Sequence, residues 1–172
     1  STTATVVDAV TRHAARLRDQ PEMRFIKRFH QEPLYLDPLA ASIEAHWREH
    51  GKPQKLVMSF HGLPRYSIEL GDPYYRDCME TARRWLEPYT EPTLKALAAS
   101  GVTEVDVVCP GFVADCLETL EEISLECRDA FLGAGGRQFR YIPALNDDPA
   151  WIAGLATLVE RHLQGWPTHS RT

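Results

Sequence analysis

One histidine and three evenly spaced glutamates are the residues of this sequence whose types and positions could carry chemistry. His61 directly follows the apolar run at residues 55–60, and Glu118, Glu122 and Glu126 recur every four residues. In an α-helix this spacing puts the three carboxylates on one face. An imidazole facing a carboxylate can bind a divalent transition metal or take a proton from a weakly acidic N–H. The residues alone do not choose between a metal site and the base of a hydrolase.

Ordinary structural roles also account for part of this pattern. Asp115 and Glu118 resemble a helix capping box, and acidic residues in a first turn favour the helix dipole. Neither effect explains Glu126, which lies beyond the first turn. Like charges four residues apart repel, so a metal ion, protons or basic side chains are expected to offset them. The corresponding structural role for His61 is a hydrogen-bonded histidine at a turn.

The elements that position these residues alternate between strands and helices. Apolar runs predict strands at residues 55–60 and 104–109, and weaker patterns predict strands at 23–28 and 138–142. The predicted helices cover residues 3–18, 37–50, 73–84, 90–100, 115–132 and 148–164, with Asp37 as an N-cap before Pro38. This alternation indicates an α/β fold, a three-layer αβα sandwich around a parallel sheet. Ligands bind beyond the carboxyl ends of such strands, so His61 and Glu118 should face one crevice.

The composition argues against several classes of function. The 172 residues are 44% hydrophobic and 25% charged, as in a globular domain, and the net charge of −5 argues against nucleic-acid binding. No run approaches the length of a membrane span, and the start lacks the pattern of a signal peptide. A cytoplasmic location is therefore expected, although the chain begins with Ser1 and a lost targeting segment stays open. The four cysteines form no C-x-x-C pair and are expected to be reduced thiols.

Two longer stretches resemble a known family. The run LVMSFHGLPRYSIELGDPY at residues 56–74 resembles the histidine motif of ferrochelatases, and VVCPGFVADCLETLEEI at 107–123 resembles their glutamate motif. The flanking pieces STTAT, WLEPYT, FLGAGG and YIPALN are similar as well. The resemblance covers nearly the whole chain. It implies a chelatase-like lobe of an enzyme of haem biosynthesis, a lyase that inserts Fe²⁺ into protoporphyrin IX and releases two protons.

The resemblance also implies roles for individual residues. His61 and Glu118 would be the catalytic and metal-binding pair, and Asp115 would support them. Glu122 and Glu126 would continue an acidic line that carries iron or protons. Which member of the pair takes protons and which delivers iron stays open, because their titrations would be coupled.

The same resemblance bears on cofactors and partners. Ferrous iron and protoporphyrin IX are expected as substrates, without a tightly bound cofactor. A 2Fe–2S cluster is not expected, because Cys116 and Cys127 lie on one predicted helix and no C-terminal cysteine cluster follows. The lack of a hydrophobic C-terminal extension favours a bacterial type without a transmembrane segment. Peripheral membrane contact and the oligomeric state stay open.

The chain departs from the family in two places. The family has an N-terminal lobe that forms the other wall of the porphyrin cleft, and this chain begins where that lobe ends. Between Arg84 and Trp85 the family has the rest of a helix, a loop and a strand, so an inner strand is expected to be missing. We divide the chain into a lobe-junction helix–strand–helix (1–50), a catalytic α/β lobe (51–165) and a tail (166–172).

These departures leave the function of the chain itself open. We expect it to have little or no chelatase activity alone. The alternatives are a cobalt or nickel chelatase of tetrapyrroles, a non-catalytic porphyrin- or haem-binding module, and a plain structural fragment. A cobalt or nickel chelatase would favour extra histidines near the metal site, where this helix offers Cys116 and glutamates.

Overall fold

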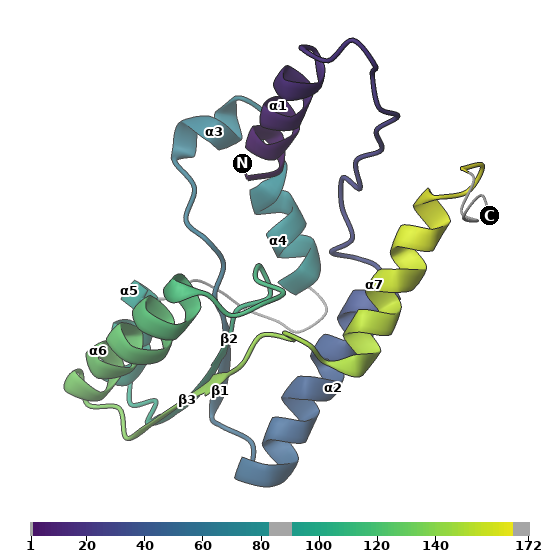
Figure 1. Cartoon of the computed structure of the whole chain (residues 1–172). Coiled ribbons are helices and arrows are strands. Elements are labelled where there is room, and N and C mark those ends of the chain that lie inside the picture. The colour runs from purple at the N-terminus through teal and green to yellow at the C-terminus, as the bar shows by residue number, and fades with distance from the viewer. Residues whose placement is uncertain (1, 83–90, 167–172) are drawn as a thin grey trace.

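Three parallel strands form the centre of the molecule (Figure 1). The computed structural model describes residues 2–82 and 91–166. Strands β1 (Lys55–Met58), β2 (Glu104–Val108) and β3 (Gln138–Ile142) pair in that order. Met58 pairs with Val108, and Val108 pairs with Ile142. The carboxyl ends of the three strands therefore lie at one edge of the sheet.

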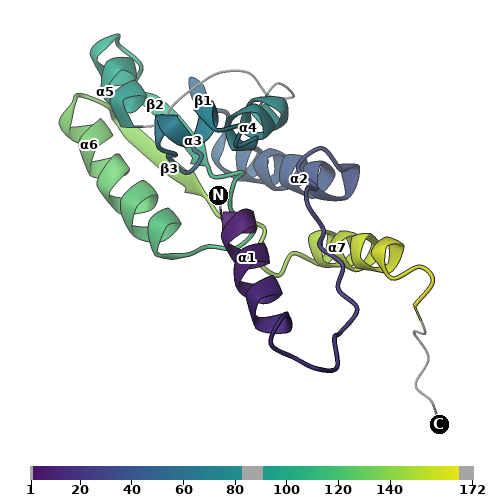
Figure 2. The same cartoon turned by 90° about the horizontal axis from the view of Figure 1, so that it is seen from above.

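Helices cover both faces of this sheet (Figures 1 and 2). Helices α2 (Pro33–His50) and α7 (Pro149–His162) pack on one face, against Met58, Val108 and Ile142. On the other face, α5 (Glu91–Ala99) and α6 (Arg128–Gly133) pack against Val57, Val105 and Val107. Neighbouring residues of a strand point to opposite faces, so each apolar run supplies both cores. The predicted three-layer αβα architecture is confirmed.

Three further helices lie beyond the carboxyl edge of the sheet. They are α1 (Thr2–Ala14), α3 (Arg65–Glu69) and α4 (Tyr74–Ala82) (Figure 1). The sequence did not predict α3, which directly follows Pro64. Helix α1 buries only Ala14 among its described side chains. It is therefore attached to the rest of the molecule through little packed surface. No described helix is long and apolar enough to cross a membrane.

The prediction for residues 23–28 was wrong. They form no strand, and the segment between α1 and α2 has no ladder partner among the described residues. Its anchor is Arg24, whose Nη1 donates to the carbonyl oxygens of His162 and Gln164 at 2.6 and 2.8 Å. An extended segment becomes a strand only beside another strand. The helix–strand–helix description of residues 1–50 therefore fails in its middle element.

The start of α2 also differs from the prediction. The helix begins at Pro33 after Glu32, not at Pro38 after Asp37, and Pro38 lies inside it. Pro33 occupies the first turn, where a missing N–H costs nothing. The end of the helix is as predicted, because Gly51 adopts φ 78° directly after His50.

The long α-helix predicted for residues 115–132 is instead two elements. A π-helix, η1 (Glu118–Cys127), continues directly into α6. Hydrogen bonds from i to i+5 make a π-helix wider than an α-helix. With more residues per turn than an α-helix, it still keeps residues four apart, such as the three glutamates, near one face.

The family segment that is expected to be missing between Arg84 and Trp85 leaves no gap among the three described strands. β1 pairs directly with β2, and β2 with β3, so an inner strand is not absent from this ladder. That prediction was wrong, because β1 is an edge strand of the described sheet. Other predicted elements are confirmed within a few residues, namely β1, β2, β3, α1, α4, α5 and α7. The predicted cap at Thr90, the WLEPYT piece and most of the 166–172 tail lie outside the described residues.

Candidate functional site

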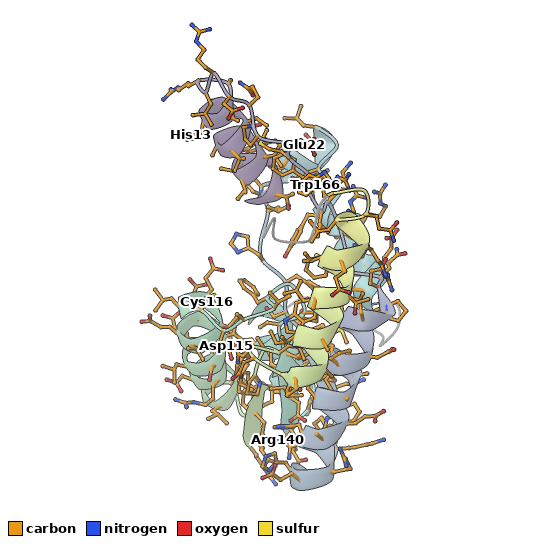
Figure 3. All side chains as sticks on the ribbon, turned by 45° about the vertical axis from the view of Figure 1, so that its right-hand side comes forward. His13, Glu22, Asp115, Cys116, Arg140 and Trp166 are labelled. Atoms are coloured by element: carbon orange, nitrogen blue, oxygen red, sulfur yellow. The ribbon has the colours of Figure 1, made fainter. Side chains whose placement is uncertain are left out.

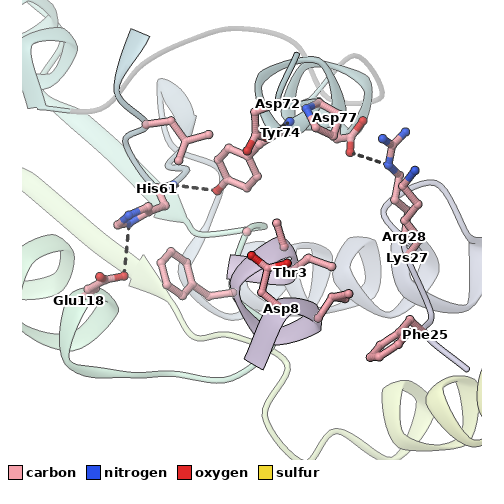
Figure 4. A pocket seen from close by; sticks show the side chains of 16 residues that line it. Thr3, Asp8, Phe25, Lys27, Arg28, His61, Asp72, Tyr74, Asp77 and Glu118 are labelled. Carbon is pink, nitrogen blue, oxygen red and sulfur yellow. Dashed lines mark hydrogen bonds and ion pairs between the residues drawn. The ribbon is translucent and has the colours of Figure 1, made fainter. Parts of the chain in front are cut away.

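His61 and Glu118 meet beyond the carboxyl edge of the sheet (Figure 4). His61 lies just after β1, and Glu118 begins η1 after the loop that leaves β2. The distance from His61 Nδ1 to Glu118 Oε2 is 3.5 Å, and the side chains are 53% and 43% exposed. Neither side chain is buried in packing contacts, so both are accessible to a ligand. The structure thus brings the predicted pair together, while its catalytic and metal-binding roles remain predictions.

A tyrosine fixes the backbone of His61. The His61 N–H donates to Tyr74 Oη at 3.0 Å, and the Tyr74 N–H donates to Asp72 Oδ1 at 2.9 Å at the start of α4. Burial raises the pKa of Tyr74, so its hydroxyl stays neutral. Gly111 permits this arrangement, because a Cβ there would lie 2.9 Å from Tyr74 Oη. The loops after β1 and β2 are thereby held together around one hydroxyl group.

Asp115 organises the start of η1. Its Oδ1 accepts hydrogen bonds from Tyr141 Oη at 2.6 Å and from Thr119 Oγ1 at 3.0 Å. Its Oδ2 accepts from Asn146 Nδ2 at 2.8 Å, and the Asp115 N–H donates back to Asn146 Oδ1. Burial alone would raise the pKa of Asp115, but hydrogen bonds from Tyr141 and Asn146 outweigh it and lower that pKa. Asp115 is therefore an ionised anchor, bonded to Thr119 and not in a capping box with Glu118.

The rest of the predicted acidic line does not join the pair. Glu122 and Glu126 are exposed, and of the three glutamates Glu118 is the one that lines the cavity beside His61. Their predicted role in carrying iron or protons stays a prediction.

A cavity of ≈ 860 Å³ lies beside the pair. This volume falls within the roughly 300–1,000 Å³ of small-molecule and cofactor sites. Thr3 and Asp8 of α1 and Phe25 of the following segment line one side, facing His61 and Tyr74 (Figure 4). Figure 3 shows α1 standing apart from the sheet, at a distance from Asp115 and Cys116. The loosely packed helix is thus a wall of the cavity.

The four cysteines differ in burial. Cys109 and Cys127 are buried, Cys78 is half-buried and Cys116 is exposed, and all are free thiols. Burial raises the pKa of Cys109 to about 12 and that of Cys78 to about 11. These two thiols are therefore protonated and unreactive at neutral pH.

Several positioning residues escaped the sequence analysis. Tyr74 and Asp72 lie in the GDPY piece of the histidine motif, and Tyr141 and Asn146 lie in the YIPALN piece. The resemblance marked both pieces but assigned these residues no role. Their contacts join segments distant in the sequence, which no local spacing reveals.

Comparison with known proteins places these features in a family. The sequence model of the ferrochelatase family matches residues 1–84 and 82–163. The chain belongs to the ferrochelatase family. Its relatives include the ferrochelatases of Bordetella pertussis (strain Tohama I), 69% identical, and of Azoarcus sp. (strain BH72), 53% identical. Each alignment covers 98% of this chain and 53% of the relative, so the chain spans about half the length of these ferrochelatases.

The comparison also locates the internal difference from the other ferrochelatases. The two matched stretches meet at residues 82–84. Both alignments run over 192 positions, although the chain has 172 residues. The relatives therefore contain residues that this chain lacks, as the predicted break between Arg84 and Trp85 requires.

Proposed function

We propose that this chain carries the iron- and proton-handling part of a ferrochelatase site. The reaction is the insertion of Fe²⁺ into protoporphyrin IX, which yields protohaem and two protons. The observation that carries the proposal is the His61–Glu118 pair, 3.5 Å apart and half-exposed beside a cavity in a member of this family. The proposal includes a cytoplasmic location and no resident cofactor or 2Fe–2S cluster.

The chemistry required matches what this pair can do. Two pyrrole N–H bonds must break as four ring nitrogens bind iron, with each bonding electron pair staying on its nitrogen. An imidazole lone pair and a carboxylate can each accept one proton and pass it to water, since both groups reach solvent. The same atoms are ligands for Fe²⁺.

Asp115 and Tyr74 supply the rigidity that such a site needs. Asp115 ties the start of η1 to β3 and to the segment after it, and Tyr74 ties the backbone of His61 to α4. Positioned groups transfer protons faster because less reorganisation accompanies the reaction.

We further propose that the chain alone turns over slowly or not at all. Relatives at 69% and 53% identity are about twice as long, and a porphyrin ring bound against one wall is held in place by fewer contacts. The direct test is an anaerobic assay of the purified chain with Fe²⁺ and protoporphyrin IX. Haem formation at a rate close to that of the Bordetella pertussis enzyme would contradict this part of the proposal.

The pair itself is tested in a chimera. Residues 51–82 and 91–166 of this chain would replace the matching residues of the Bordetella pertussis enzyme. We expect insertion activity, and a loss of about 10²–10⁴-fold in kcat on His61→Ala or Glu118→Gln, the range for a general acid–base group. Glu121→Gln makes the same chemical change at an exposed position of η1 and should keep kcat within about threefold. Full activity in both the His61→Ala and the Glu118→Gln chimera would contradict the proposal. If the unmodified chimera binds porphyrin but inserts no iron, the chain is a non-catalytic porphyrin-binding module.

A further inference from the structure

A second group of metal-ligating side chains converges away from His61 and Glu118. His30, Asp77 and Glu80 each offer one atom, and these three atoms lie within 4.8 Å of one another. His30 Nε2 is 3.0 Å from Glu80 Oε2 and 4.0 Å from Asp77 Oδ1. Asp77 lines the same cavity, across from His61 (Figure 4).

The carboxylates are turned in a way that favours a cation between them. Asp77 Oδ2 is paired with Arg28 Nε at 3.2 Å. Asp77 Oδ1 is buried and lies 3.7 Å from Arg76 Nη2, but it accepts no hydrogen bond from the described residues. Glu80 Oε1 faces Arg76 Nε at 3.8 Å, and Glu80 Oε2 turns to His30. Asp77 Oδ1 and Glu80 Oε2 thus both face the imidazole of His30, and Glu80 Oε2 also accepts from Gln31 Nε2. A buried carboxylate oxygen without a donor is costly, and a bound cation would remove that cost.

The local fold holds the three ligands in this geometry. Asp77 and Glu80 are three residues apart on α4, so they lie on one face of the helix. His30 comes from the turn before α2, and all three side chains are largely shielded from solvent. One imidazole nitrogen and two carboxylate oxygens suit Zn²⁺, Fe²⁺ or Co²⁺, with bonds of about 2.0–2.2 Å. Small shifts would bring the three atoms to those bond lengths, and water would complete the coordination.

We propose that His30, Asp77 and Glu80 form a second site for a divalent transition metal, separate from the His61–Glu118 pair. The site does not depend on the function proposed for that pair. Arg28 and Arg76 act as outer partners that orient the two carboxylates, as hydrogen-bonded groups around metal ligands commonly do.

Cobalt titration of the whole chain tests this proposal. The background is the double variant His61→Ala with Glu118→Gln, so that binding at that pair is removed. Visible absorption of bound Co²⁺ should then report one equivalent of metal. We expect His30→Ala and Glu80→Gln each to raise the Kd for Co²⁺ by at least about tenfold. Matched controls are His13→Ala and Glu121→Gln, which remove the same groups at exposed positions and should leave the Kd unchanged.

Thermal unfolding provides an independent readout. Zn²⁺ should raise the Tm of the double variant and not that of the same protein carrying Glu80→Gln, because only a bound ligand stabilises the folded state. Glu80→Gln keeps the size of the side chain and an acceptor for His30. If His30→Ala fails to fold, the Co²⁺ titration and the Tm of Glu80→Gln still test the metal site. The proposal is overturned if the double variant binds no Co²⁺, or if its affinity survives Glu80→Gln.

Discussion

Two pairs of ionisable side chains in this molecule differ in how much of their surface the protein covers. Asp106 of β2 is fully buried, and its two oxygens accept from Arg140 Nε at 2.6 Å and Trp47 Nε1 at 2.9 Å. His61 and Glu118 lie 3.5 Å apart with about half of each side chain in solvent. The first pair has its hydrogen-bonding capacity filled by the protein, whereas the second leaves capacity for a ligand. We call Asp106 and Arg140 the closed pair, which contributes to stability. We call His61 and Glu118 the open pair, which is available to a ligand.

The strongest test of this contrast is removal of the cation from the closed pair. Arg140→Met leaves the Asp106 carboxylate buried without its charge partner and also frees the carbonyl oxygens of His50 and Gly51. Breaking a buried pair in this way costs about 3–5 kcal/mol. Urea unfolding, followed by tryptophan fluorescence, measures the loss. Arg161→Met breaks an exposed pair with Glu32 and should cost at most about 1 kcal/mol; equal losses in the two variants would contradict the distinction.

Asp115 lies between these extremes, because it is charged, half-buried and bonded to four groups. Asp115→Asn removes the charge that accepts from Tyr141, Thr119, Asn146 and the Ala144 N–H, and should cost about 2 kcal/mol at pH 7. The folded state lowers the pKa of Asp115, so this stability is present above the unfolded value and is lost as pH falls through the folded value.

The stabilities of the Asp115→Asn variant and the original chain should therefore converge as the pH falls below about 4, near the ordinary pKa of aspartate. Urea midpoints measured at several pH values follow this convergence. Asp129→Asn changes an exposed carboxylate on α6 and is the matched control. A stability difference that stays constant down to the lowest pH would mean that ionisation of Asp115 is not the source of its contribution.

Gly111 tests the positioning of the open pair with a smaller effect. In Gly111→Ala the new methyl group would lie 2.9 Å from Tyr74 Oη and 3.6 Å from Phe60, so Tyr74 must move from the His61 N–H. Overpacking of this kind costs about 1–3 kcal/mol. Urea unfolding gives the cost, and the shift of the His61 amide resonance reports the broken bond. Gly62→Ala adds the same methyl group where nothing lies within 4 Å, and it should leave the His61 amide hydrogen bond intact.

The meeting of His61 and Glu118 could be predicted because two simple rules decide it. Apolar runs marked β1 and β2 as buried strands, and parallel strands end at one edge of a sheet. The residues that follow them must then be neighbours. The sheet, most helices and the site pair all follow from this reasoning.

What the sequence did not reveal depends on contacts between distant segments. Residues 23–28 have the local pattern of a strand, but no described strand lies beside them. The switch from α- to π-helix at Glu118 changes hydrogen-bond partners by one residue without changing the hydrophobic pattern. The partners of Asp115, such as Tyr141 of β3 and Asn146 after it, are set by the fold. Sequence patterns therefore placed the predicted site residues better than the residues that support them.

The smallest expected effect on stability belongs to the open pair itself. His61→Ala and Glu118→Gln remove half-exposed groups, and solvent screens their mutual attraction, so each should change the free energy of unfolding by less than about 1 kcal/mol. A double-mutant cycle in urea would measure the coupling between them, for which we expect a few tenths of a kcal/mol. The cycle compares the two single variants with the double variant. A coupling above about 2 kcal/mol would contradict the distinction between the two pairs, because it would mean that the fold depends on the contact between His61 and Glu118.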